Sequence, residues 1–240
     1  KELYFNRFPD MQHICAKANL TLCVERLRKT HPKHCEWYPR SWVLGSKEEI
    51  ESFKEAFVPG KSYILKPDGG LQGMGISIVM DWAQVESALQ KNNALEEQWE
   101  KERNDPDLAE KRCERAKESR INNELPDDRH LGDLVAQEYI ADPALIGGTK
   151  FDMRVYVLLT SLKPLKAYIM KEGLARFCTA QYTPPTKENI SNAYMHLTNY
   201  HLNVTNETFQ QPDNKDGQAV VDVGGSSASK RSIQIALSQL

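Results

Sequence analysis

Several features that would identify a class of protein are missing from this 240-residue sequence. Its five cysteines form no CxxC pair and are odd in number, which favours reduced thiols over a disulfide framework or a zinc site. No apolar run approaches the ~20 residues of a membrane-spanning helix, and the first residues lack the pattern of a signal peptide. The formal net charge of -2 gives no electrostatic reason to expect nucleic acid. We therefore expect a soluble intracellular protein with no nucleic-acid partner and no membrane span.

Other composition values are those of a folded globular protein. Apolar residues make up 40% of the chain and charged residues 27%, so the chain is neither disordered nor collagenous. The length allows one large domain, or two lobes that share a cleft.

Two polar residues predict the starts of helices. Ser46 is followed three residues later by Glu49, the spacing of a capping box, and the helix should end before Pro59. Asp81 can cap a second helix that continues through Leu89.

A glycine-rich turn over residues 69–75 links two expected strands, 62–66 and 76–79. Glycines let backbone N–H groups approach a phosphate closely, and Lys66 closes the first strand. P-loop and dinucleotide folds are disfavoured because the turn leads into a strand and no GK[ST] follows. A protein kinase is excluded because HRD and DFG are both missing. A nucleotide held under a hairpin remains, and the alternative is an ordinary turn beside a solvated lysine.

The composition changes between residues 92 and 132, where 12 acids and 8 bases stand among few large apolar residues. We predict a solvated insertion, with a partner-binding helix as the alternative. Four strands are expected after it, the last three as a meander with turns at residues 163–164 and 172–173, and the chain ends in a helix-like tail, 233–240. The predicted strands cover residues 134–140, 151–160, 165–170 and 174–177.

Eight motifs in a fixed order run through nearly the whole chain outside the insertion. They are Asn6-Arg7-Phe8-Pro9, Pro39-Arg40-Ser41-Trp42-Val43-Leu44, Ile64-Leu65-Lys66-Pro67-Asp68-Gly69-Gly70, Gln72-Gly73-Met74-Gly75-Ile76, Gln137-Glu138-Tyr139-Ile140, Lys150-Phe151-Asp152-Met153-Arg154, Glu172-Gly173-Leu174-Ala175-Arg176-Phe177 and His196-Leu197-Thr198-Asn199-Tyr200. Together they resemble the tubulin–tyrosine ligase-like family of ATP-grasp amino-acid ligases, most closely its polyglutamylases.

This resemblance implies an α+β fold of the ATP-grasp, glutathione synthetase-like kind. Two lobes with mainly antiparallel sheets would flank an ATP cleft. Residues 1–10 would end a missing N-terminal domain, 11–136 would form the central lobe with the insertion 92–132, and 137–240 would form an incomplete C-terminal lobe.

The resemblance also assigns residues to ATP. Lys66 would contact the phosphates under a flap of Gln72 and Gly73, and the strand Gln137–Ile140 would pair its exposed edge with adenine. Lys150 and Asp152 would reach the phosphates and ribose, and alternation along a strand puts residues 150, 152 and 154 on one face. The assigned ATP-binding residues are Lys66, Gln72, Gly73, Gln137, Glu138, Tyr139, Ile140, Lys150, Asp152, Thr198 and Asn199.

Three residues would bind the incoming amino acid. Arg176 resembles the anchor of its α-carboxylate, because a guanidinium grips a carboxylate with two hydrogen bonds. A structural arginine would instead pair with a nearby acid. Tyr200 and Lys230 resemble further amino-acid contacts. His196 is read as a structural hydrogen-bonding residue, since its spacing from His201 suits no shared metal.

The implied reaction joins an amino acid, most simply glutamate, to glutamate side chains of tubulin or microtubule C-terminal tails through an acyl phosphate. It needs ATP and Mg²⁺ but no nucleophilic side chain of the enzyme. The family's magnesium ligands, an aspartate and a Glu-x-Asn, are expected beyond Leu240, so no metal ligand and no catalytic residue is assigned. We expect this chain to be an inactive fragment on its own.

Met74 stands where the family usually has arginine. A non-catalytic ATP-grasp module that binds tubulin is therefore a second hypothesis. A glycine or tyrosine ligase of the same family, or a ligase for a non-tubulin acid, is a third. The family resemblance implies action in the cytoplasm at the cytoskeleton, with the cilium, flagellum or basal body as candidate places.

Overall fold

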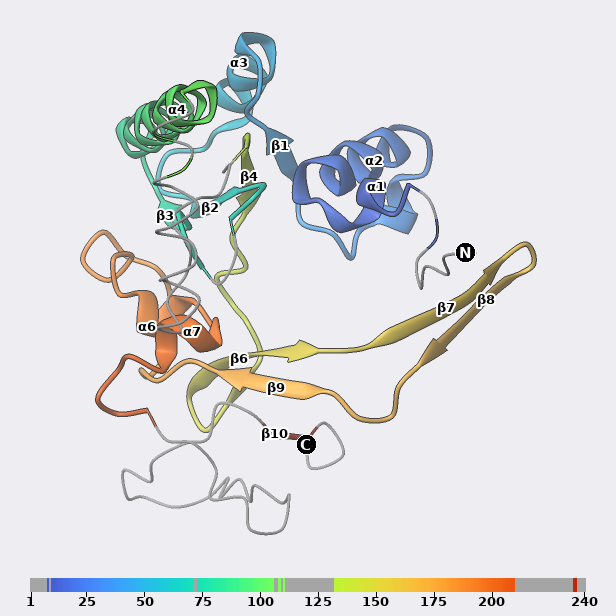
Figure 1. The fold of residues 1–240 in the computed structure, drawn as a ribbon. Helices are drawn as coiled ribbons and strands as arrows, with labels where there is room; N and C mark the ends of the chain where they lie inside the picture. Colours follow the sequence, from blue (N-terminus) through green and yellow to red (C-terminus); the bar gives the residue numbers. More distant parts are fainter. Residues whose placement is uncertain are drawn as a thin grey trace. The chain divides into compact units, whose positions relative to one another are not determined.

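The computed structural model describes residues 8, 10–70, 73–105, 108, 110, 132–209 and 235–236. It combines helices with antiparallel sheets, as expected for an α+β protein (Figure 1). The chain divides into two compact units, Lys1–Ile140 and Ala141–Leu240, and each unit is described by itself. The sequence predicted the boundary between the two lobes at residues 136–137, four residues before the observed boundary between the units.

The first unit is built on a four-stranded sheet in the order β1-β4-β2-β3, which comprises Ser41–Val43, Leu134–Glu138, Tyr63–Pro67 and Ser77–Val79. The pair β2–β3 is the predicted strand–turn–strand unit, with Tyr63 opposite Val79. The much later strand β4 inserts between β1 and β2, so the centre of this sheet joins residues far apart in sequence.

One face of the sheet carries the main core. Helices α3 (Lys47–Ala56) and α4 (Trp82–Asn104) contribute to it. Phe53 and Tyr63 are fully buried there with ring centroids 5.3 Å apart in an edge-to-face contact. On the other face a smaller cluster joins Ala18 of α2 (Lys17–Thr30) to Val43 and Val135. Near α2 lie the short helices α1 (Gln12–Cys15) and η1 (Pro32–Cys35).

Both predicted helix starts are confirmed. The Ser46 side chain accepts a hydrogen bond from the Glu49 backbone N–H at 3.3 Å. Asp81 caps α4 by accepting from Gln84 N at 2.9 Å, and the Gln84 side chain completes a capping box.

The cap at Ser46 supports a measurable prediction. We expect Ser46→Ala to lower the free energy of unfolding by about 1 kcal/mol, because a helix-terminal N–H loses its acceptor. Ser52→Ala is the matched control, since Ser52 lies exposed in the middle of α3. Urea denaturation followed by circular dichroism compares the two variants, and equal effects would contradict a capping role for Ser46.

The charged insertion begins as a continuation of α4, where most side chains from residue 93 to 104 are exposed, as predicted. Its two ends are fastened together. Asn92 Nδ2 donates to the Gly132 carbonyl oxygen at 3.0 Å, and Gly132 N donates to Glu96 Oε1 at 2.9 Å. The chain therefore returns to the sheet next to the point where it left.

The second unit contains a sheet in the order β10-β9-β6-β5. Its strands are Ile235–Ala236, Leu174–Phe177, Thr149–Arg154 and Leu145–Ile146. Two short helices, α6 (Ala193–His196) and α7 (Tyr200–Asn203), also belong to this unit. Strand β10 contradicts the helix-like tail at residues 235–236, because those residues pair with β9.

A two-stranded ribbon, β7 (Val157–Leu162) and β8 (Leu165–Ile169), interrupts this sheet in sequence. The predicted meander is therefore wrong: β9 pairs with β6 and not with β8, and the expected strand 151–160 is two strands. The predicted turn at residues 163–164 does join β7 to β8. Two residues, 155–156, connect β6 to β7, but four residues, 170–173, connect β8 to β9. Because these segments differ in length, the β6–β9 pairing does not continue into the β7–β8 pairing.

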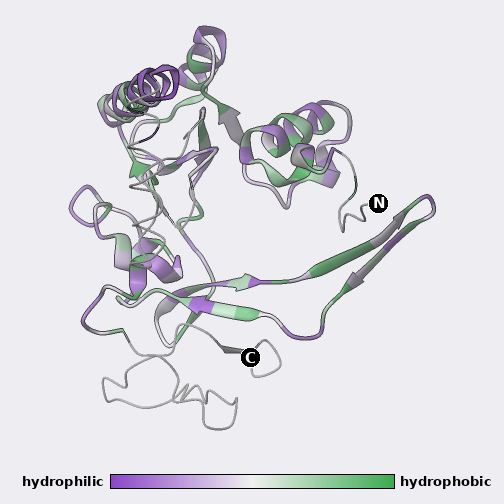
Figure 2. Cartoon of the chain, in the orientation of Figure 1, coloured by the Kyte–Doolittle hydropathy of each residue, from purple (hydrophilic) through white to green (hydrophobic). Residues whose placement is uncertain are grey.

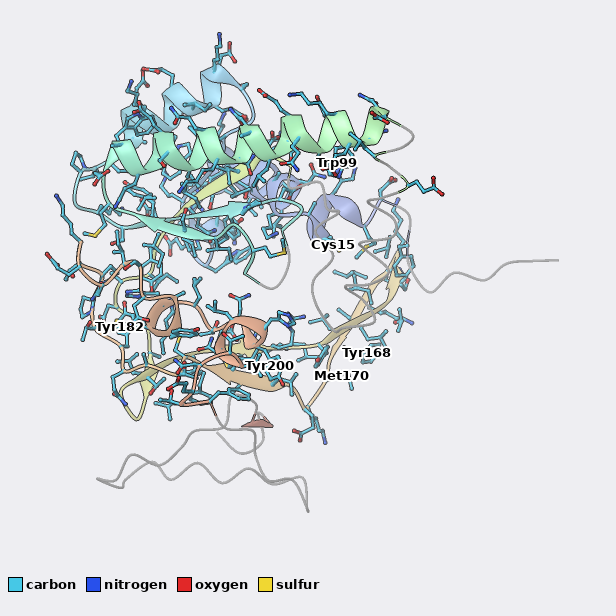
Figure 3. All side chains as sticks on the ribbon, turned by 60° about the vertical axis from the view of Figure 1, so that its left-hand side comes forward. Cys15, Trp99, Tyr168, Met170, Tyr182 and Tyr200 are labelled. Atoms are coloured by element: carbon cyan, nitrogen blue, oxygen red, sulfur yellow. The ribbon has the colours of Figure 1, made fainter. Side chains whose placement is uncertain are left out.

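Much of β7 is hydrophobic in sequence (Figure 2), and apolar side chains of the ribbon are exposed, including Val157, Leu158 and Leu165. Tyr168 and Met170, labelled in Figure 3, are 58% and 57% exposed. Among the described residues, no helix is both long enough and apolar enough to cross a membrane.

Candidate functional site

Lys66 lies near the end of β2, directly before Pro67 and the glycine turn. Its ammonium donates to Gln137 Oε1 at 2.6 Å, and Gln137 Nε2 donates in turn to Ser41 Oγ at 2.8 Å. The strand register makes Lys66 and Gln137 diagonal neighbours on one face of the sheet. Two predicted nucleotide-binding residues therefore come together, and a chain of hydrogen bonds across β2, β4 and β1 fixes the position of the cation.

The turn after Lys66 requires glycine at specific points. A Cβ on Gly70 would lie 2.9 Å from the Met74 carbonyl oxygen, and one on Gly75 would lie 2.6 Å from Pro67 Cγ. Gly73 and Gly75 also have φ angles of 94° and 68°, which side chains disfavour. At the base of the turn, the backbone of Gly70 thus packs on the Met74 backbone and that of Gly75 on the Pro67 ring. Gln72, the other predicted flap residue, lies outside the described residues.

The strand expected to pair with adenine does not offer the exposed edge that we predicted. β4 lies between β1 and β2. The N–H groups of Glu138 and Tyr139 already donate to Arg40 O at 2.9 Å and Ser62 O at 3.0 Å. Residue alternation could not reveal this, because it does not report which strands flank β4. Tyr139 is buried and Ile140 is 57% exposed, and the role of residues 137–140 in binding ATP stays a prediction.

In the second unit, Asp152 on β6 and Arg176 on β9 stand directly opposite each other. Arg176 Nε donates to Asp152 Oδ1 at 2.7 Å and Nη2 donates to Oδ2 at 2.5 Å. These hydrogen bonds hold the pKa of Arg176 above its ordinary value. Within the described residues nothing accepts a hydrogen bond from Nη1, so one edge of the guanidinium is engaged by Asp152 and the other is not.

Thr198 joins the same pair. Its hydroxyl donates to Asp152 Oδ2 at 2.7 Å, although it comes from a loop 46 residues later in sequence. The side chains of Arg176 and Asp152 are 20% and 36% exposed, so the pair is accessible from one side. Three predicted site residues, Asp152, Arg176 and Thr198, therefore form one polar cluster.

Lys150 precedes Asp152 by two residues on β6 and is partly buried. Its ammonium donates to the His196 carbonyl oxygen at 3.0 Å. Burial lowers the pKa of Lys150, an effect that Cys178 and Asp152 partly oppose. Burial also raises the pKa of the Cys178 thiol to about 12, which disfavours the thiolate form at neutral pH.

Asn199 and Tyr200 are the other predicted contacts from this region. The Asn199 carbonyl oxygen accepts from Asn203 N at 3.1 Å and from Asn203 Nδ2 at 3.0 Å. The ring of Tyr200, labelled in Figure 3, meets Phe209 edge-on with centroids 5.8 Å apart. These contacts stabilise the first turn of α7. The binding roles assigned to Asn199 and Tyr200 stay predictions.

His196 has the structural role that we predicted. The residue is 1% exposed, and Nε2 lies 3.1 Å from the Asn189 carbonyl oxygen. No group of three His, Cys, Asp or Glu that could hold a metal occurs in the part of the chain that the structure describes. Lys230, the third predicted amino-acid contact, lies outside that part.

Burial lowers the pKa of His196 below its ordinary value of 6.5. The unfolded chain therefore binds a proton at this residue at a higher pH than the folded chain, and stability should fall as the pH drops below 6.5. We expect His196→Gln to weaken this pH dependence. Urea midpoints at about pH 7.5 and about pH 5.5 test this, and an equal pH dependence in wild type and His196→Gln would contradict it.

The comparison with known families now bears on these residues. The model described as the tubulin-tyrosine ligase family matches residues 3–239. The chain belongs to the tubulin-tyrosine ligase family. The resemblance stated from the eight motifs is thereby confirmed, and with it an ATP-grasp-like fold of helices and antiparallel sheets.

Several curated members of the tubulin-tyrosine ligase family are similar to this chain. The human tubulin polyglutamylase TTLL11 is 34% identical over 216 residues, which are 87% of this chain and 25% of that protein. The human tubulin polyglutamylase TTLL13 is 35% identical over 205 residues, 85% of this chain and 20% of that protein. The mouse tubulin polyglutamylase TTLL6 is 32% identical over 207 residues, which are 86% of this chain and 20% of that protein. The chain thus spans a quarter or less of the length of these relatives.

Sequence reasoning missed three residues beside the predicted family site. Ser41 supports Gln137, while Lys17 and Asp68 connect α2 to the base of the glycine turn. A signal for Lys17 existed, because a lysine at the first position of a helix opposes the helix dipole and suggests a tertiary partner. Ser41 stands in one of the eight motifs, but its role could not be read there, because its partner Gln137 comes from a strand 96 residues away.

Proposed function

We propose that this chain carries the ATP-binding and amino-acid-binding residues of a ligase that adds glutamate to glutamate side chains of tubulin tails. The observation that carries the proposal is the 34% identity, over 87% of the chain, to a protein named a tubulin polyglutamylase. Because the chain spans a quarter of that protein, the proposed activity is that of the full-length gene product. Its place of action would be the cytoskeleton, including that of cilia or flagella.

The donor set suits a nucleotide. Lys66, fixed by Gln137 beside a turn that must contain glycine, offers a cation and backbone to phosphate oxygens. In the second unit, Lys150 is a partly buried cation that the family resemblance assigns to ATP. ATP would supply the phosphoryl group that activates a carboxylate.

Arg176 suits the amino-acid substrate. Asp152 orients its guanidinium through Nε and Nη2. The remaining edge can donate two parallel hydrogen bonds to the α-carboxylate of free glutamate. Any α-amino acid has this carboxylate. Selection of glutamate over glycine or tyrosine therefore requires contacts other than Arg176.

The proposed reaction has two steps. A carboxylate oxygen of the tubulin tail forms a bond to the γ-phosphorus of ATP, and the bond from that phosphorus to the bridging oxygen breaks to release ADP. The amino nitrogen of glutamate then attacks the acyl carbon, loses a proton, and displaces phosphate to give an isopeptide bond. Cationic side chains lower the barrier of the first step by balancing the charge that collects around the phosphates. We assign no magnesium ligand, because the described residues hold no metal-binding group of three.

The test uses the purified full-length gene product with microtubules, ATP, magnesium and labelled amino acids. We expect incorporation of glutamate by the wild type and a loss of at least ~100-fold in Lys66→Met. Incorporation of glycine or tyrosine instead would contradict the choice of glutamate. Microtubule binding without transfer of any amino acid would contradict the ligase and support the non-catalytic alternative, which Met74 favours because it adds no charge to the glycine turn.

A further inference from the structure

Lys17 holds the base of the glycine turn through three hydrogen bonds. Its ammonium donates to the carbonyl oxygens of Pro67 at 2.9 Å, Asp68 at 2.8 Å and Gly70 at 2.9 Å. An ammonium has three protons, so these bonds use all of its donors. A lysine on α2 is therefore committed to a backbone segment about 50 residues later in the chain.

Asp68 completes the contact in the opposite direction. Its Oδ1 accepts from the Ala18 backbone N–H at 2.9 Å, at the N-terminus of α2. Its carboxylate satisfies one helix-terminal donor and offsets the unfavourable placement of Lys17 at the positive end of the helix dipole. Burial lowers the pKa of Lys17, and the charge of Asp68 opposes that shift.

These bonds set the direction of the backbone N–H groups. Across a trans peptide, a carbonyl and the N–H of the next residue point in opposite directions. With the Pro67 and Asp68 carbonyls on Lys17, the N–H groups of Asp68 and Gly69 must point away from it. Asp68 N does so, since it donates to Asp133 O at 2.9 Å. Within the described residues, nothing accepts a hydrogen bond from Gly69 N.

We propose that Lys17 is a positioning residue for phosphate binding: by holding three carbonyls of the turn base, it directs the Gly69 amide toward the phosphates and away from α2. The inference rests on the proposed function, because it assumes that the turn next to Lys66 binds a nucleotide. Lys17 itself has no donor left for the ligand.

The test measures two properties of the full-length gene product. Calorimetry gives the affinities for ATP and for adenosine, and hydrogen exchange without ligand follows the amides of residues 68–70 and 73–75. We expect Lys17→Met to weaken ATP binding by ~10-fold or more, to leave adenosine binding unchanged, and to speed exchange at the turn. Lys17→Gln keeps two donors and should give an intermediate effect, and it serves as the test if Lys17→Met does not fold. Lys29→Met, at an exposed position of the same helix, is the control.

The outcomes separate this inference from the proposed function. If the wild type binds ATP no better than adenosine, or binds neither, the proposed function fails whatever Lys17→Met does. If the wild type prefers ATP and Lys17→Met keeps that preference, the inference about Lys17 alone is overturned. An equal loss of ATP and adenosine binding in Lys17→Met would also overturn it, because a general structural role affects both ligands.

Discussion

Arg176→Lys should raise the KM for glutamate by ~100-fold in the full-length gene product while changing kcat and the affinity for ATP much less. Arginine can pair with Asp152 through one edge and bind a substrate carboxylate through the other. Lysine keeps the charge but offers a single ammonium, which cannot make two bidentate contacts. A 100-fold loss corresponds to about 2.7 kcal/mol, the range of a charge-assisted pair of hydrogen bonds.

The chain offers a closely matched control for this substitution. Arg28 also donates through Nε to a carboxylate, Glu25 Oε2 at 3.1 Å, and its side chain is 19% exposed against 20% for Arg176. Arg28→Lys should leave the KM for glutamate at the wild-type value. If Arg176→Lys also leaves KM unchanged, the guanidinium serves only to pair with Asp152, as a structural arginine would.

Lys66→Met should weaken ATP binding to the full-length gene product by ~100-fold or more and leave adenosine binding nearly unchanged. Methionine keeps most of the aliphatic length but removes the charge that would face the phosphates. The Gln137 side-chain oxygen also loses its 2.6 Å donor, so we expect the free energy of unfolding to fall by about 1 kcal/mol. Calorimetric titration with ATP, ADP and adenosine measures the first effect and urea denaturation the second.

Lys61→Met separates this effect from a general loss of positive charge. Lys61 lies just before the same strand and is exposed, and its ammonium pairs with Glu138 at 2.6 Å. We expect its ATP affinity to stay within about twofold of the wild type, since exposed ion pairs contribute little. Equal losses in Lys61→Met and Lys66→Met would mean that net charge, and not the position of Lys66, governs nucleotide affinity.

Local features of this fold could be predicted, because short-range chemistry determines them. The caps at Ser46 and Asp81 follow from residues three positions apart, and the glycine turn follows from glycines that a Cβ would disrupt. The polar face of β6 was also predictable from alternation, but the strand pairing that sets Asp152 opposite Arg176 was not.

Strand partners could not be predicted in the same way. The apolar pattern of residues 134–138 is equally compatible with an edge strand and a central strand, because pairing depends on segments far away in sequence. For the same reason a meander was expected where β9 returns to β6 across the ribbon. The three hydrogen bonds of Lys17 likewise depend on where α2 packs, and the sequence of α2 does not determine this position.

The hydrogen bonds of Gly132 to Asn92 and Glu96 divide α4 into two parts with different constraints on their length. Up to Glu96 the helix is constrained by the sheet, and a change of length there would shift the register of the core. Beyond that point, added residues cost only loop entropy, about 0.6 kcal/mol for each doubling of length. A reporter domain inserted after Asn104 should therefore leave the folding of the first unit intact.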